Sequence, residues 1–218
     1  ATQNSCREFK IIKKDLGLRE VIPIDYKYDS GEKDFLKIAL EVLKDFGCIP
    51  DIGYDINISS KIPINSGLSS SSALIIAWVN FLLSTFTDHK ITPNLLAEIS
   101  YRIEVLEIGG SGGKMDQYTI ANGKTIFLDT KTDNIIPFDH KLCNMIIGVS
   151  SQSKDTQGLL KKLKENALMS IEIVKNHDLD FSFTNIEKID LNKYLSFLDD
   201  NLKPFFSCLL YTSPSPRD

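Results

Sequence analysis

The chain has 218 residues, of which 42% are hydrophobic, and it carries a formal net charge of −4 at pH 7. This composition is typical of an ordinary globular protein of one or two domains, and the scattered lysines form no basic stripe that would indicate a nucleic-acid partner. No apolar run reaches the roughly 20 residues that a membrane-spanning helix needs, and the N-terminus has no signal-peptide pattern. We therefore expect a cytoplasmic protein with neither a membrane nor a nucleic acid as its partner.

Helices and strands are predicted in mixed order from the first half of the chain. Apolar residues recur every three to four positions over residues 34–46, and Gly47 follows as a C-terminal stop, which predicts an amphipathic helix. Apolar and polar residues then alternate from Ile52 to Ile58, as in a half-buried strand. A longer apolar helix is predicted over residues 73–85.

The rest of the chain continues this mixed pattern. Thr92 as N-cap and Pro93 at the first helical position begin a helix that is expected to end at the glycines from Gly109 onward. Its inward face is predicted to hold Leu96, Ile99, Ile103 and Leu106. Further elements are predicted as strands over residues 125–129 and 144–149 and a helix over residues 158–174, with Leu159 and Leu163 on its inward face. Strands and helices in this order predict an α+β fold.

Four consecutive serines, Ser69–Ser72, stand directly before the apolar helix. The first turn of a helix has backbone N–H groups without intrahelical partners and a partial positive charge, and it therefore attracts anions. Gly67 allows the backbone to turn close to an anion, and the hydroxyls add ligands for phosphate oxygens or a hydrated Mg²⁺. Serine is also a favoured helix cap, but one cap needs one serine, so the run favours a phosphate-binding loop.

This loop resembles the phosphate loop of the GHMP kinases, the family of galactokinase, homoserine kinase, mevalonate kinase and phosphomevalonate kinase. The family pattern P-x-x-x-G-L-S-S-S is matched from Pro63 to Ser71, although Asn65 stands where most members carry a small residue. The resemblance implies that the loop wraps the phosphates of ATP and that one of its serines, Ser70 or Ser71, ligates Mg²⁺. The implied ATP-binding residues are Pro63, Gly67, Leu68, Ser69, Ser70, Ser71 and Ser72.

A second segment, EVLEIGGSGGKMDQ from Glu104 to Gln117, resembles the part of galactokinases in which a helix-borne glutamate precedes the aspartate of a G-x-M-D-Q run. The resemblance implies that Glu104 binds Mg²⁺ and that Asp116 accepts the proton of the substrate hydroxyl. The residues alone leave alternatives open. Glu104 and Glu107 are either solvated surface carboxylates or a repelling pair that a bound cation would relieve, and Asp116 is alternatively a turn or helix-cap residue.

Lys114 stands where galactokinases usually have an apolar residue, and in this respect the chain resembles the manno-heptose phosphate kinases, which carry G-K before x-D-Q-Y. The sequence leaves three roles open for this lysine: an interaction that holds Asp116 in place, a contact with a substrate phosphate, or exposure to solvent without a functional contact.

The resemblance implies a two-domain fold of the GHMP kinase type. We expect an N-terminal, ATP-binding domain like ribosomal protein S5 domain 2 over residues 1–140, and a truncated ferredoxin-like C-terminal domain over residues 141–207. The last stretch, residues 208–218, resembles the translation of a transposase adapter used in sequencing libraries, and it is treated as a non-native tail. The sequence is therefore expected to be a fragment without the family's N-terminal substrate motif and its C-terminal glycine-rich motif.

The implied activity is ATP- and Mg²⁺-dependent phosphorylation of a sugar hydroxyl, with a monosaccharide as the small-molecule substrate of a galactokinase-like enzyme. Within the family, a heptose phosphate or mevalonate-type kinase is the alternative. From another class, a non-catalytic sensor that binds sugar and ATP is the alternative. Because a sensor has no chemical need for a base, the presence of both Glu104 and Asp116 favours the enzyme.

Overall fold

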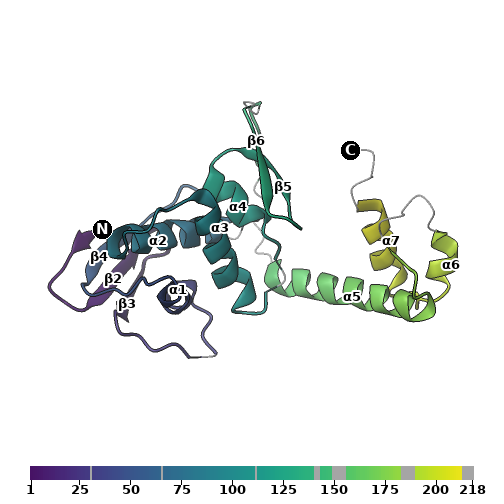
Figure 1. Ribbon diagram of the computed structural model, residues 1–218, viewed down its shortest axis with the longest axis horizontal. Helices are drawn as coiled ribbons and strands as arrows, with labels where there is room; N and C mark the ends of the chain where they lie inside the picture. Colours follow the sequence, from purple (N-terminus) through teal and green to yellow (C-terminus); the bar gives the residue numbers. More distant parts are fainter. Residues whose placement is uncertain are drawn as a thin grey trace. The chain divides into compact units, whose positions relative to one another are not determined.

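The structure is a computed structural model, which describes residues 1–29, 31–64, 66–110, 112–139, 143–148, 156–182 and 190–212 (Figure 1). The chain divides into two compact units, Ala1–Lys154 and Asp155–Asp218, and each unit is described by itself. The division of the family domains at residue 140 stays a prediction.

The first unit is built on a four-stranded sheet with the strand order β1-β4-β2-β3. Its strands are β1 (Thr2–Gln3), β2 (Glu8–Lys13), β3 (Leu18–Pro23) and β4 (Tyr54–Ile58). A 3₁₀ turn, η1 (Lys14–Leu16), joins β2 to β3, which run antiparallel, whereas β4 runs parallel to β2. Parallel neighbours need a long crossover connection, and here that connection carries the first helix.

Helices in the described residues complete the body of this unit, and a β-hairpin extends from it (Figure 1). The helices are α1 (Phe35–Lys44), α2 (Ser70–Phe86), α3 (Pro93–Tyr101), which continues into the π-helix η2 (Arg102–Leu106), and α4 (Met115–Asn122). The hairpin consists of β5 (Thr125–Asp129) and β6 (Asn134–Phe138). Thr92 caps α3 as predicted, because its hydroxyl accepts a hydrogen bond from the Leu95 N–H at 3.2 Å.

The core of the first unit lies between the sheet and helices α1 to α3. Phe9 and Ile11 of β2 and Ile22 of β3 share the inward face of the sheet and are at most 1% exposed. Trp78 of α2 packs edge-on against Phe9 with ring centroids 5.3 Å apart, and its indole N–H donates to the Leu36 carbonyl at 3.0 Å. This contact fixes α2, and therefore its N-terminus, relative to the sheet and α1.

The structure confirms two predicted helices, residues 34–46 as α1 and residues 73–85 as α2. It also confirms two predicted strands, residues 52–58 as β4 and residues 125–129 as β5. Two predictions for the first unit are wrong. Residues 143–148 form no strand in the part of the predicted segment that the structure describes. Leu106 is 58% exposed and Val105 is buried instead, because the wider turn of η2 rotates the helix face that the α-helical period had placed inward.

The second unit contains α5 (Thr156–His177), α6 (Leu191–Leu195) and α7 (Lys203–Thr212), and its described residues include no strand. A small core holds Val174, Phe181, Tyr194, Leu198, Leu202 and Phe206. The predicted helix over residues 158–174 is confirmed as α5, but Leu159 and Leu163, which were expected to face inward, are 42% and 40% exposed. Among the described residues, no helix is both long and apolar enough to cross a membrane.

Candidate active site

The backbone before α2 has an unusual conformation at two residues of the predicted phosphate loop. Gly67 has φ 72° and Ser69 has φ 52°, both in the left-handed region that favours glycine. A Cβ at Gly67 would meet no atom within 4 Å, so glycine is needed there for its backbone angle and not for space. A serine in this region is strained, and such strain is often found at functional sites.

The N-terminus of α2 has no side-chain cap. Ser69 is the N-cap residue, yet its hydroxyl makes no capping hydrogen bond, and the first intrahelical bond runs from the Ala73 N–H to the Ser69 carbonyl at 3.1 Å. The amides of the first turn, Ser70 to Ser72, precede this bond and have no intrahelical acceptor. The alternative that the serines merely cap the helix therefore finds no support at Ser69, and the turn has the donors and the dipole that an anion needs.

Side chains from two helices, α2 and α4, converge on the carboxylate of Glu104 in η2. The Ser71 hydroxyl donates to Oε1 at 2.6 Å, the Ser72 hydroxyl donates to Oε2 at 2.7 Å, and the Gln117 amide donates to Oε2 at 2.6 Å. These four residues, Ser71, Ser72, Glu104 and Gln117, are called the Glu104 cluster below. The structure thus brings the serine loop and the second predicted motif into direct contact, although Glu104 follows Ser71 by 33 positions in the sequence.

Glu104 owes its place to the π-helix that ends α3. Its neighbours Ile103 and Val105 are buried in the body of the unit, which leaves the carboxylate between them directed at α2 and α4. The chain then turns back sharply, with the Gly110 N–H donating to the Val105 carbonyl at 2.7 Å. A Cβ at Gly110 would lie 3.3 Å from the Val105 Cα, so a glycine suits this close approach. Single π-turns within helices are frequent at functional sites.

Glu107 does not share the environment of Glu104. Arg102 donates through Nε to Glu107 at 2.8 Å and through Nη1 to Asp45 at 2.7 Å, and these bonds raise the pKa of the guanidinium above its ordinary value. The expected repulsion between Glu104 and Glu107 is therefore relieved by groups of the protein itself. A bound cation is not needed to explain why both carboxylates are present.

Asp116 lies in the first turn of α4, next to Gln117, and is exposed. Among the residues that the structure describes, no hydrogen bond or ion pair engages its carboxylate. Lys114 does not pair with it. The Lys114 ammonium instead pairs with Asp133 in the β5–β6 turn, and this hydrogen bond raises the pKa of the lysine. The Asp116 carboxylate is thus available to a ligand from the solvent side.

The oxygen atoms of Glu104, Ser71 and Ser72 suit a hard cation such as Mg²⁺, because carboxylate and hydroxyl oxygens are the ligands that such ions prefer. In the described part of the chain, no three His, Cys, Asp or Glu side chains gather as they would around a metal held by protein ligands alone. A single carboxylate beside a helical turn with free amides is compatible with the usual Mg²⁺ arrangement, in which one or two carboxylates bind the ion and phosphates and water complete the shell.

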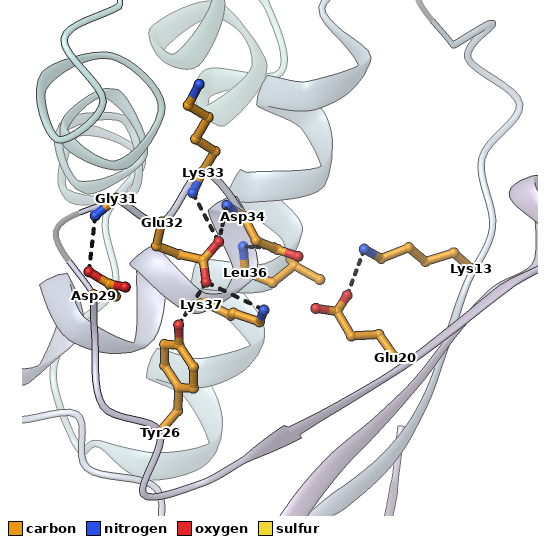
Figure 2. Close-up of polar contacts among 10 residues, drawn as sticks. All are labelled: Lys13, Glu20, Tyr26, Asp29, Gly31, Glu32, Lys33, Asp34, Leu36 and Lys37. Carbon is orange, nitrogen blue, oxygen red and sulfur yellow. Dashed lines mark hydrogen bonds and ion pairs between the residues drawn. The ribbon is translucent and has the colours of Figure 1, made fainter.

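A second polar group, which the sequence analysis did not predict, surrounds the start of α1 (Figure 2). The Tyr26 hydroxyl donates to Glu32 Oε2 at 2.7 Å, the Lys33 and Asp34 amides donate to Oε1 at 2.9 and 3.0 Å, and Lys37 pairs with Oε2 at 3.4 Å. The bond with Tyr26, followed by those from the Asp34 and Lys33 amides, lowers the pKa of Glu32 to about 2, and the same bond, together with desolvation, raises the pKa of Tyr26 to about 12. None of the predicted site residues belongs to this group, so we assign it to holding the N-terminus of α1.

Comparison with known proteins agrees with this geometry. Residues 34–124 match the family model described as the GHMP kinases N terminal domain, a segment that includes α2, Glu104 and Asp116. The fold and the candidate site thus make this chain similar to the GHMP kinases over that segment.

The chain is also similar to galactokinases. It is 25% identical to the galactokinase of Clostridium perfringens over 209 residues, which cover 91% of this chain and 53% of that protein. It is 35% identical to the galactokinase of Streptococcus mutans over 135 residues, which cover 58% of this chain and 34% of that protein. The chain thus spans about half the length or less of these curated relatives.

Solved structures show the same fold. Lactococcus lactis galactokinase complexed with galactose superposes with a TM-score of 0.63 at 19% identity, covering 93% of this chain and 55% of the other. Methanococcus jannaschii mevalonate kinase gives a TM-score of 0.58 at 18% identity, and the match covers 99% of this chain and 69% of the other. A D-glycero-D-manno-heptose 1-phosphate kinase gives a TM-score of 0.51 at 16% identity, and the match covers 96% of this chain and 68% of the other.

Proposed function

We propose that the protein transfers the γ-phosphoryl group of ATP to a hydroxyl of a monosaccharide, as a galactokinase-like kinase. The single observation that carries this proposal is the convergence of Ser71, Ser72 and Gln117 on Glu104 at the uncapped N-terminus of α2. It supports the proposal because phosphoryl transfer depends mainly on positioning and on neutralising charge, and this cluster joins an anion-binding turn to a metal-binding carboxylate.

The phosphate-binding role is proposed for the loop from Pro63 to Ser72. Gly67 and Ser69 turn the backbone so that the free amides of the first helical turn are presented together. The Ser70 hydroxyl is proposed to contact a phosphate oxygen, and both Ser70 and Leu68 are half-buried. The proposed ATP-binding residues remain Pro63, Gly67, Leu68, Ser69, Ser70, Ser71 and Ser72.

Glu104, together with Ser70 or Ser71, is proposed to hold Mg²⁺. When bound, the ion would neutralise phosphate charge during transfer. Asp116 is proposed to accept the proton of the attacking sugar hydroxyl, and its exposure and its lack of an ion pair among the described residues leave its carboxylate free to do so. A general base of this kind contributes about 10²- to 10⁴-fold to the rate.

The finer features of the fold are also proposals. We propose that residues 1–140 form a domain like ribosomal protein S5 domain 2, and that residues from 141 onward begin a ferredoxin-like domain. We also propose a cytoplasmic location. Galactose is the first sugar to test, because it is the ligand in the L. lactis structure.

A heptose phosphate or mevalonate-type kinase is the second candidate, supported by the likeness to both kinds of structure and by Lys114. Its ammonium is paired with Asp133, so contact with a substrate phosphate would require that pair to open. A sensor that binds sugar and ATP without chemistry is the third candidate.

The test uses the protein expressed from its complete reading frame. ADP release is measured with ATP, Mg²⁺ and, separately, galactose, other hexoses, heptose phosphates and mevalonate. The proposal expects turnover with galactose or another hexose. Turnover only with a heptose phosphate or mevalonate supports the second candidate, and sugar and ATP binding without ADP release supports the sensor.

A further inference from the structure

We propose that Gln117 is a positioning residue, which together with Ser72 holds the Glu104 carboxylate in the orientation that the metal-bound nucleotide requires. This inference rests on the proposed kinase function. It adds a residue to the site, because Gln117 is assigned neither to nucleotide nor to metal by the motifs.

The orientation of the Gln117 side chain follows from chemistry. A carboxylate only accepts hydrogen bonds, so the nitrogen of the Gln117 amide must face Glu104 Oε2, to which it donates at 2.6 Å. The amide oxygen is then directed elsewhere. It is fully buried and has no hydrogen-bond partner among the described residues, while the residue as a whole is 2% exposed.

An unpaired buried carbonyl is unfavourable, and an apolar side chain of the same size would avoid its cost. Packing alone therefore does not explain a glutamine at this position. Its amide N–H₂ is the feature that an apolar residue lacks, and that group serves the Glu104 carboxylate.

The two oxygens of Glu104 have different surroundings. Oε2 receives both of its hydrogen bonds from residues that are 2% exposed, Ser72 and Gln117. Oε1 receives its hydrogen bond from Ser71, which is exposed. Oε2 is therefore fixed from inside the protein, while Oε1 lies on the solvent side with a partner that can turn its hydroxyl to another acceptor.

Gln117 also connects two proposed roles. It follows Asp116 directly in the first turn of α4, so its bond to Glu104 ties the helix that carries the proposed base to the carboxylate of the proposed metal site. Lys114, the N-cap residue of α4, pairs with Asp133 of the β5–β6 turn. The position of Asp116 relative to the phosphate loop thus depends on Gln117.

The test uses two replacements in the protein expressed from its complete reading frame. Gln117→Met keeps the length of the side chain without a donor, and Gln117→Leu is a branched apolar side chain of similar volume that also lacks a donor. Ser100→Ala is the matched control, because Ser100 is fully buried, also carries an unpaired polar atom, and has no bond to Glu104.

Two quantities are measured for each folded variant: the affinity for ADP as a function of free Mg²⁺, by calorimetry, and the Mg²⁺ concentration at half-maximal kinase activity. Loss of a residue that orients a metal ligand typically weakens metal affinity about 10- to 100-fold. We expect a shift of that size in both measurements for Gln117→Met and Gln117→Leu, and no shift for Ser100→Ala. Excess Mg²⁺ should restore much of the activity.

Unchanged Mg²⁺ dependence in folded Gln117 variants would overturn the inference, as would a fall in kcat that no Mg²⁺ concentration restores. If the Gln117 variants do not fold, Ser72→Ala decides, because it removes the other donor to Oε2 and must shift the Mg²⁺ dependence in the same direction. Calorimetry also separates this inference from the kinase proposal. If the parent protein binds MgADP but transfers no phosphate, the kinase proposal fails. The role of Gln117 is then decided by comparing the MgADP affinities of the parent and the variants.

Discussion

Replacing Glu104 by alanine tests the Glu104 cluster through stability. The change leaves two buried donors, Ser72 and Gln117, without their acceptor, whereas the exposed Ser71 hydroxyl can turn to water. A buried donor without a partner costs about 1–3 kcal/mol, and with some access of water to the new space we expect a total loss of about 2–4 kcal/mol. For a domain of this size that loss corresponds to a fall in Tm of about 4–16 °C.

Glu107→Ala is the matched control, because Glu107 lies one turn further along and pairs with Arg102 near the surface. Loss of such a pair costs at most about 1 kcal/mol. Urea unfolding gives the free energy of unfolding of both variants, and melting curves with saturating MgATP give the stabilisation by ligand, which reaches about 2.7 kcal/mol at 100 times Kd. That stabilisation should persist in Glu107→Ala and vanish in Glu104→Ala. Equal losses of stability in the two variants, or equal stabilisation by MgATP, would refute the reasoning.

Three further predictions follow from other contacts. Replacing both Ser70 and Ser71 by alanine should weaken MgATP binding in calorimetry while costing the fold about 1 kcal/mol or less, since alanine is a good helix former; a large fall in Tm with unchanged ATP affinity would mean that the serines are structural. Because the pKa of Glu32 is lowered to about 2 and that of Tyr26 is raised to about 12, the stability that they contribute should be present at neutral pH, be lost as the pH falls from about 4.5 towards 2, and be lost again as it rises from 10 towards 12. Tyr26→Phe should flatten both limbs of the unfolding free energy against pH, and an unchanged profile would contradict the assignment. Lys114→Met should lower stability by at most about 1 kcal/mol and leave kcat with galactose within a few-fold of the parent, whereas a much larger fall in kcat would place Lys114 at the substrate.

The parts of the fold that were predicted correctly are those with a clear local pattern. α1 and α3 have apolar residues at helical spacing, and Thr92 caps α3 as its sequence predicts. β2 was not predicted, because Ile11 and Ile12 are consecutive and break the alternation, and α4 was not predicted, because MDQYTIAN has no apolar face. Contacts with other parts of the chain stabilise such an element: β2 forms hydrogen bonds with a neighbouring strand on each side, β3 and β4.

In the candidate site, too, features with a local sequence pattern were predicted and features that depend on tertiary contacts were not. The serine loop and Glu104 were proposed from motifs, and the structure brings them together. Sequence spacing could not show that Gln117 donates to Glu104, because that bond depends on the π-turn at the end of α3 and on the return of the chain at Gly110. The same π-turn made the prediction for Leu106 wrong, since a period of 3.6 residues does not anticipate a wider turn.

Turnover of the Asp116→Asn variant is the most direct test of the claim that this protein is a kinase with a carboxylate base. The change keeps the shape of the side chain but removes its charge and its ability to accept the proton. The measurement is kcat with ATP and the best sugar of the panel, normalised to folded protein, in the protein expressed from its complete reading frame. We predict a fall of about 10²- to 10⁴-fold with nearly constant ATP affinity, and a kcat within a few-fold of the parent would contradict the role of Asp116.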